Sequence, residues 1–206
     1  NKAAIKKIVA ALDLLENDTV IEIGPGHGEL TFEILKKPVK KLVAIEKDHQ
    51  LASELESRIM NYELWRGKVK IVNSDVLKFL KSPNSKFLIH NSKLVGNIPY
   101  YITGHLLRII GELENKPEIS VFTIQKEVGE RLVAQPPKMN RLAASVQIWA
   151  EAKIITNIPA QDFDPPPKVD SAVIKLCKKN TIISENYFKT VRILFQQPRK
   201  TVLNNL

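Results

Sequence analysis

Cysteine and long apolar runs are what this sequence has least of. Cys177 is the only cysteine among 206 residues, so a framework of disulfide bonds is excluded. No apolar run reaches the length that a membrane-spanning helix needs, and no signal peptide opens the chain. These absences predict a cytoplasmic protein that has no contact with a membrane.

Motifs for metal binding and for nucleophilic catalysis are missing as well. The four histidines and the single cysteine do not show the spacing of metal ligands. Neither a nucleophile elbow nor a P-loop occurs. We therefore expect no metal site.

What the chain does have is a substantial apolar fraction and an excess of positive charge. Hydrophobic residues make up 44% of the sequence, which is enough for a folded core and suits one domain, or one domain plus part of a second. The net charge of +9 favours a polyanionic partner such as nucleic acid over an acidic membrane surface. Charge alone fits a merely soluble basic protein equally well.

Strand-like apolar runs alternate with helical patterns along most of the chain. We expect strands at 19–23, 41–46, 69–72, 93–97 and 119–124. This alternation is typical of a parallel α/β sheet with helices on both faces. The pattern changes after residue 141, where 145–149 and 172–176 are expected to form an antiparallel hairpin at one edge of the sheet.

A glycine-rich loop, Gly24-Pro25-Gly26-His27-Gly28, follows the first expected strand and precedes a helix. Glycine allows the backbone to approach a ligand closely. A dinucleotide site places its third glycine three residues after the second, whereas here that position is Glu29. The spacing therefore favours an S-adenosylmethionine loop over an NAD loop.

Two acidic residues stand at the ends of the next two expected strands. Glu46 lies 20 residues after Gly26 and can accept both hydroxyl groups of a ribose. Asp75 can accept from the adenine amine of a cofactor. Either residue could instead be an ordinary helix N-cap or turn residue.

The tetrad Asn97-Ile98-Pro99-Tyr100 ends the fourth expected strand and matches the N-x-P-Y motif of methyltransferases that modify exocyclic amines. An adenine amine is a poor nucleophile because its lone pair is delocalised into the ring. The side-chain oxygen of Asn97 and the carbonyl of Ile98 can each accept one of its N–H groups, which aims the lone pair at a methyl donor. Pro99 fixes the backbone, and Tyr100 offers a face for stacking a base. The alternative is a plain turn that ends a strand.

A proline-rich loop follows Phe163 and separates the last two expected strands. Held on this stiff segment, the Phe163 ring could cover the second face of a flipped base or contact a sulfonium by a cation–π interaction. A core aromatic that anchors the loop is the alternative interpretation.

With these motifs together, the chain resembles the ribosomal RNA small-subunit adenine dimethyltransferases. The resemblance covers essentially the whole chain. It rests on residues 22–28, 97–102, 163–173 and 199–201. The erythromycin-resistance methyltransferases share the first two of these segments, whereas 169–173 and Arg199-Lys200-Thr201 look more like the small-subunit family.

The resemblance implies a Rossmann-like class I S-adenosylmethionine methyltransferase fold, with a mostly parallel seven-stranded sheet and an antiparallel edge hairpin. It implies a methyltransferase domain at 1–180 and the beginning of a small helical C-terminal domain at 181–206. The family's N-terminal Gly-Gln-x-Phe-Leu stretch is absent, and Asn1 looks like the residue just after it. Pro198 stands where family members often carry a basic residue.

The resemblance also implies the chemistry and the partners. Such an enzyme transfers two methyl groups to each of two adjacent adenosines in small-subunit ribosomal RNA, late in assembly of the subunit, and we expect it to act as a monomer. The catalytic set is Asn97, Ile98, Pro99, Tyr100 and Phe163. The residues implied to bind S-adenosylmethionine are Asn1, Glu22, Gly24, Gly26, Gly28, Glu46, Lys47, Asp75, Val76 and Asn97.

Two rival functions stay open at this point. The fold could serve as a non-catalytic assembly or transcription factor that binds ribosomal RNA, although the intact tetrad argues against this. It could also methylate adenine in DNA or in large-subunit RNA. A run of basic residues towards the C-terminus favours phosphate contact, and comprises Lys175, Lys178, Lys179, Lys189, Arg192, Arg199 and Lys200.

Overall fold

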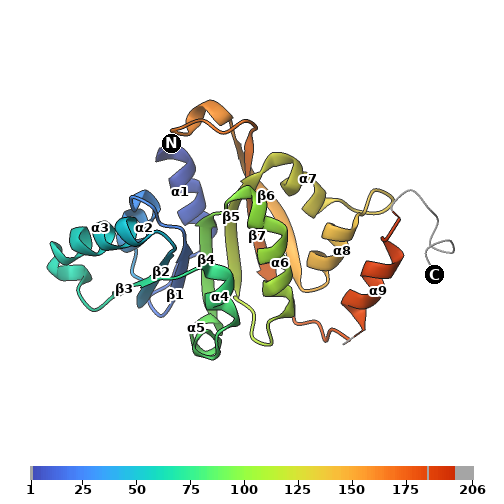
Figure 1. Cartoon of the computed structure of the whole chain (residues 1–206), viewed down its shortest axis with the longest axis horizontal. Coiled ribbons are helices and arrows are strands. Elements are labelled where there is room, and N and C mark those ends of the chain that lie inside the picture. Colours follow the sequence, from blue (N-terminus) through green and yellow to red (C-terminus); the bar gives the residue numbers. More distant parts are fainter. Residues whose placement is uncertain (1, 185, 198–206) are drawn as a thin grey trace.

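The computed structural model describes residues 2–184 and 186–197, and it contains a seven-stranded sheet in the order β3-β2-β1-β4-β5-β7-β6 (Figure 1). The strands are β1 Thr19–Ile23, β2 Lys41–Glu46, β3 Val69–Asn73, β4 Ser92–Asn97, β5 Ile119–Gln125, β6 Ala150–Ile158 and β7 Ser171–Lys178. The first five strands pair in parallel, while β7 is antiparallel to both β5 and β6. The Rossmann-like methyltransferase architecture expected from the sequence is confirmed.

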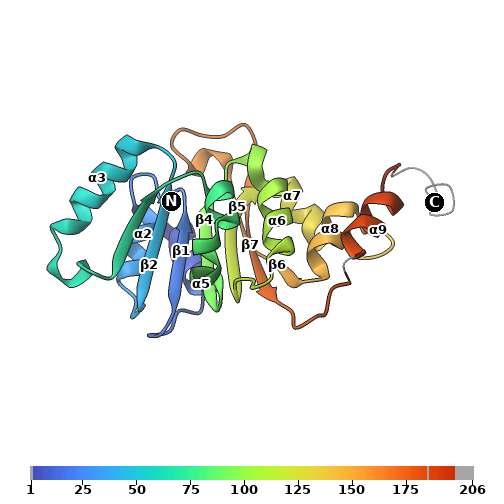
Figure 2. The ribbon, with the colours of Figure 1, turned by 60° about the horizontal axis from the view of Figure 1, so that its bottom comes forward.

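Helices cover both faces of this sheet (Figure 2). They are α1 Lys2–Ala11, α2 Glu29–Leu35, α3 His49–Met60, α4 Val76–Lys81, α5 Lys86–Ile89, α6 Thr103–Glu112, α7 Lys126–Val133, α8 Arg141–Gln147 and α9 Tyr187–Leu194. Among the described residues, no helix is long and apolar enough to cross a membrane.

The central strands are apolar because they are buried on both faces. In β1, Val20 packs in the core beneath α1 and α2, whereas Ile21 and Ile23 pack in the core on the opposite face, beneath α4 to α8. The next strand repeats the alternation, with Leu42 in the first core and Val43 in the second. Such strands read as continuous apolar runs, which is why the sequence located them.

One element was predicted wrongly. Residues 145–149 do not form a strand, because α8 runs through Gln147 and the edge strand β6 begins at Ala150. The Asn140 side chain caps α8 by accepting hydrogen bonds from the N–H groups of Leu142 (3.0 Å) and Ala143 (3.1 Å). Trp149, which is 2% exposed, marks the turn from the helix into the strand. The expected antiparallel pair is present, but it joins β6 to β7.

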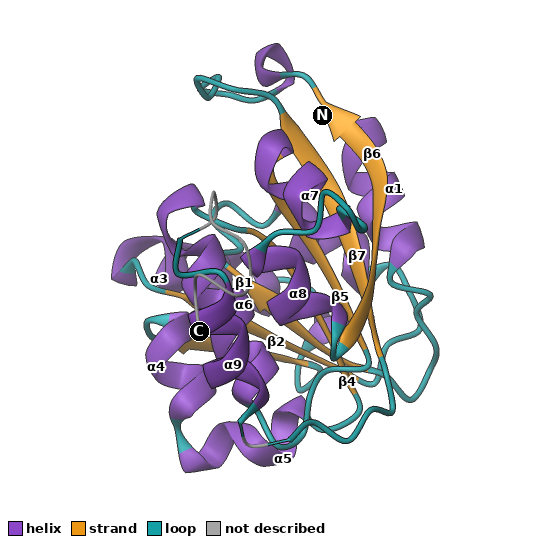
Figure 3. Ribbon diagram, turned by 90° about the vertical axis from the view of Figure 1, so that its right-hand side faces the viewer, coloured by secondary structure: helices purple, strands orange, loops and turns teal. Residues whose placement is uncertain are grey.

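The C-terminal part of the described chain folds back onto α8. Figure 3 views the molecule from this side and shows α8 and α9 in front of the sheet. The Tyr187 hydroxyl donates to the Ala144 carbonyl at 3.1 Å, which fixes the start of α9 against α8. The domain boundary near residue 180 stays a prediction.

Candidate functional site

The strand order creates a switch point between β1 and β4. From β1 the chain continues to β2 on one side, and from β4 it continues to β5 on the other side. Ligands of open α/β sheets bind at such points, beyond the carboxyl ends of the strands. Ile23 pairs with Gly96 in the register of these two strands, so the glycine loop and the tetrad start side by side. A Cβ placed on Gly24 would lie 4.0 Å from the backbone oxygen of Asn97.

The glycine loop has the backbone shape that its composition predicts. Gly24, Gly26 and Gly28 all have positive φ, at 63°, 55° and 87°. Gly28 is the N-cap of α2, and a Cβ at this position would stand 2.6 Å from Leu55 Cδ1 and 3.1 Å from the Phe32 ring. Conformation and space therefore both require glycine here.

Arg58 stabilises the outer side of the glycine loop. Its guanidinium donates a hydrogen bond to the His27 carbonyl and lies 4.6 Å from the centre of the Phe32 ring. No sequence pattern indicates this role of Arg58, because it lies on α3, 31 residues away from the carbonyl that it holds.

Glu46 ends β2 and faces the glycine loop. One of its carboxylate oxygens accepts from the Gly26 N–H at 3.1 Å and the other accepts from the Asp48 N–H at 2.9 Å. Asn73 at the end of β3 reinforces this corner, because its side-chain amide donates to the carbonyls of Glu46 (3.0 Å) and Lys47 (3.1 Å). Asn73 was not among the predicted site residues.

Asp75 caps α4 and faces Lys47. Its Oδ1 accepts from the N–H groups of Leu77 (2.8 Å) and Lys78 (3.4 Å), while its Oδ2 lies 3.5 Å from the Lys47 ammonium. Partial burial tends to raise the pKa of Asp75, but these hydrogen bonds and the Lys47 charge outweigh it, and the pKa is lowered. Both roles weighed for Asp75 are thus compatible, since the helix cap uses Oδ1, while Oδ2 faces the exposed Lys47 ammonium and takes no part in the cap. Val76 is buried in the first turn of α4.

Glu22 lies beneath the loop rather than on its surface. The side chain is 1% exposed and accepts a hydrogen bond from the Thr31 hydroxyl at 2.7 Å. Burial raises the pKa of Glu22 to about 7, with smaller contributions from the charges of Glu29 and Glu46, against the opposing effect of the Thr31 hydrogen bond. In this position Glu22 supports the loop from below, and it offers no open oxygen to a ligand.

The tetrad presents oxygen acceptors at the switch point. Asn97 is exposed, whereas Ile98 is 1% exposed and its N–H donates to the Thr123 carbonyl at 3.0 Å. Among the described residues, no donor occupies the Asn97 side-chain oxygen or the Ile98 carbonyl. Two oxygen acceptors, one on an exposed side chain and one on a buried backbone, therefore lie beside the glycine loop.

The Tyr100 side chain contacts Ser171, a residue that is far away in the sequence. Its hydroxyl lies 3.0 Å from the Ser171 hydroxyl, at the start of β7. The Pro99 carbonyl accepts hydrogen bonds from the Ile102 N–H at 3.0 Å and from the Thr103 hydroxyl at 3.4 Å. These bonds close the turn after the tetrad. No local pattern indicates the contact between Tyr100 and Ser171, because the residues are 71 positions apart.

Phe163 is half-buried and packs against the core cluster beneath α1 and α2. Its loop is anchored at the base, where the Ala160 N–H donates to the Asp170 side chain at 3.0 Å. The anchoring role considered for this aromatic is therefore realised, and its contact with a base stays a prediction. Asn1 and the Arg199-Lys200-Thr201 run lie outside the described residues.

Comparison with known proteins agrees with this geometry. A family model described as ribosomal RNA adenine dimethylase matches residues 1–206. The ribosomal RNA small subunit methyltransferase A of Dehalococcoides mccartyi is 39% identical over 213 aligned residues, which cover 100% of this chain and 70% of the relative.

Solved structures match over the whole chain as well. A dimethyladenosine transferase from Plasmodium falciparum superposes with a TM-score of 0.81 at 28% identity, covering 100% of this chain and 73% of the other. The 23S rRNA methyltransferase ErmE gives the same TM-score at 23% identity, covering 100% and 81%, and this likeness concerns the fold alone.

Proposed function

The chain belongs to the ribosomal RNA adenine dimethylase family, and from this premise we propose that it dimethylates two adjacent adenosines of small-subunit ribosomal RNA at their exocyclic amines during ribosome biogenesis. The observation that carries the proposal is the pair of acceptors beside the glycine loop, namely the exposed side chain of Asn97 and the carbonyl of Ile98, whose N–H is held by Thr123. A non-catalytic RNA-binding protein would have no need of this pair.

Asn97 and Ile98 of the tetrad each accept one hydrogen of the target amine. The Asn97 side-chain oxygen accepts one N–H of the target amine and the Ile98 carbonyl accepts the other. Together they draw the nitrogen towards tetrahedral geometry and direct its lone pair at the glycine loop. No strong general base is needed, since a nitrogen that carries positive charge releases its proton readily. The rigid Ile98 backbone, bonded to Thr123, keeps this acceptor fixed.

The loop and the two strand ends suit S-adenosylmethionine, which supplies an activated methyl group when bound. We assign the ribose hydroxyl groups to Glu46, whose oxygens already face the loop. The adenine amine is assigned to Asp75, with Val76 against the ring and Lys47 at the rim. We assign the cofactor to the loop of Gly24, Gly26 and Gly28: an added Cβ at Gly26 would meet no atom within 4 Å, so this position leaves space for a ligand, whereas glycine at 28 lets the loop pack against Leu55 and Phe32. Glu22 acts through the loop that it supports.

The target base is proposed to stack on Tyr100, with Phe163 as its second wall. The hydrogen bond between the hydroxyl groups of Tyr100 and Ser171 orients the ring without any help from substrate. Because the cofactor loop, the acceptors and the stacking residue all come from one chain, we propose that the enzyme acts as a monomer, which light scattering of the active protein can check.

The test is methyl transfer to RNA from labelled S-adenosylmethionine. Under-methylated small ribosomal subunits, large-subunit RNA and DNA are compared at one fixed salt concentration, since charge-driven binding depends strongly on salt. We expect dimethyladenosine, identified by mass spectrometry, only in the small-subunit RNA. Transfer confined to large-subunit RNA or DNA would overturn the choice of substrate. Cofactor binding without transfer to any substrate would support the non-catalytic alternative.

A further inference from the structure

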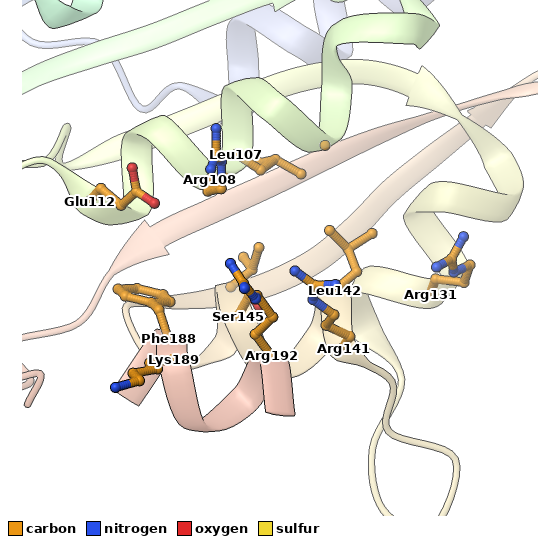
Figure 4. Close-up of a pocket in the computed structure, with 12 residues that line it drawn as sticks. Leu107, Arg108, Glu112, Arg131, Arg141, Leu142, Ser145, Phe188, Lys189 and Arg192 are labelled. Atoms are coloured by element: carbon orange, nitrogen blue, oxygen red, sulfur yellow. The ribbon is translucent and has the colours of Figure 1, made fainter. Parts of the chain in front are cut away.

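A groove runs along α6 and is closed by α8 and α9, outside the cofactor site (Figure 4). It encloses about 640 Å³, which lies within the range of small-ligand sites. The groove begins at Gly104, in the first turn of α6, directly after the segment Tyr100–Ile102. This end of the groove is therefore close in the sequence to the tetrad.

Positive side chains surround this groove. Figure 4 shows Arg108 on α6 and Arg192 on α9 on opposite sides, with Arg141 of α8 nearby. Lys189 and Arg131 complete the set of five cations, and Glu112 is the one carboxylate in the lining. Within residues 2–184 and 186–197, no ion pair neutralises any of the five cations. A site of this charge is suited to a polyanion.

The floor of the groove is apolar. Leu107 is 2% exposed, and Leu142, Val146 and Phe188 complete the surface. Phe188 makes an edge contact with the Tyr187 ring, whose centre lies 5.6 Å away. An aromatic ring among arginines provides a stacking face together with partners for phosphate, which is how proteins bind single-stranded nucleic acid.

From this combination we infer that the groove binds an unpaired nucleotide of the substrate RNA, with its base against Phe188, towards the Glu112 end of α6, and its phosphates between Arg108 and Arg192. The inference rests on the proposed function, because it assumes that the substrate is RNA. Arginine is suited to this role, since its planar guanidinium can bind a phosphate through two hydrogen bonds. The position of Gly104 beside the tetrad lets one RNA strand reach both sites.

The experiment measures binding of a fluorescent single-stranded oligoribonucleotide to the whole chain by anisotropy over a range of salt concentrations. We expect Phe188→Leu, which keeps an apolar side chain, to weaken binding about fivefold or more. Arg108→Gln and Arg192→Gln should each weaken binding and reduce the slope of log affinity against log salt by about 1. Lys37→Gln, which removes an exposed cation outside the groove, is the matched control. It should reduce the slope less than either arginine variant does.

A second probe separates stacking from charge. Inorganic polyphosphate has no bases, so Phe188→Leu should leave its binding unchanged while both arginine variants weaken it. Equal RNA affinity for all groove variants and the control would overturn the inference. Cofactor affinity and transfer by unmodified protein are measured in parallel. If the unmodified protein transfers no methyl group but its RNA binding still depends on the groove residues, the result counts against the proposed function and not against this inference.

Discussion

At the scale of single residues, Glu22 couples the stability of the glycine loop to pH. Its pKa is raised from 4.5 to about 7 in the folded protein, chiefly because the carboxyl group is buried. Between these two values the folded chain retains a proton that the unfolded chain releases. The free energy of unfolding therefore falls as pH rises through this window, by up to about 3 kcal/mol, and it does not recover above pH 7.

Glu22→Gln should remove this dependence, because glutamine stays neutral and its carbonyl can still accept from Thr31. We expect urea denaturation of the variant to show a smaller loss of unfolding free energy between pH 5 and pH 8 than the unmodified chain shows. Glu29→Gln, which changes an exposed carboxylate, is the control and should keep most of the dependence. Identical pH profiles for the unmodified chain and Glu22→Gln would show that Glu22 titrates normally.

The hydroxyl pair of Tyr100 and Ser171 provides a test of how the base slot is oriented. One hydrogen bond of this kind contributes about 1 kcal/mol, so Tyr100→Phe and Ser171→Ala should each lower kcat/KM for RNA by roughly fivefold. The double variant should be no worse than either single variant, because both remove the same bond. Cofactor affinity and thermal midpoint serve as controls. Additive losses would show that the two hydroxyl groups act independently.

The sequence allowed Asn97, Glu46 and Asp75 to be predicted as site residues because each follows an apolar run, and parallel strands bring their carboxyl ends together. It could not indicate Asn73 or Arg58 in the same way. Their roles depend on hydrogen bonds to carbonyl groups 26 to 31 positions away, which no local pattern encodes.

At the scale of elements, the parallel strands were predictable because burial on both faces gives short continuous apolar runs. The edge strand was harder to predict, because β6 is partly exposed along its length and its alternation of buried and exposed residues is weak. The segment 145–149 contains apolar residues that suit a strand, but the Asn140 cap makes 141–147 the last helix before the edge strand. A helix N-cap placed before alanine-rich sequence was the signal that we overlooked.

The pairing of β1 with β4 depends on a small residue at Gly96. A Cβ there would lie 2.5 Å from the Ile23 carbonyl oxygen and 2.9 Å from Ile23 Cβ, so the two strands would have to separate. We expect Gly96→Ala to lower the free energy of unfolding by about 2 kcal/mol or more in urea denaturation. Gly104→Ala is the matched control, because no atom lies within 4 Å of the added methyl group and alanine favours the helix. Equal stability of the two variants would contradict the packing described here.

At the scale of the whole molecule, strand order and charge act together. The order β3-β2-β1-β4-β5-β7-β6 places the glycine loop and the tetrad at one switch point. The net charge of +9 favours a polyanionic partner in general, while the basic groove along α6 has one end at Gly104, in the first turn of that helix. Long-range attraction and local alignment are thus provided by different parts of the same molecule.

Asn97 and Ile98 are proposed to prepare an adenine amine for methyl transfer. The most direct test of this role is single-turnover methylation of under-methylated small subunits by Asn97→Ala, with cofactor affinity measured on the same preparation. We predict that transfer falls by a factor on the order of 100 or more while the chain stays folded and still binds S-adenosylmethionine. Transfer at close to the unmodified rate would contradict the account.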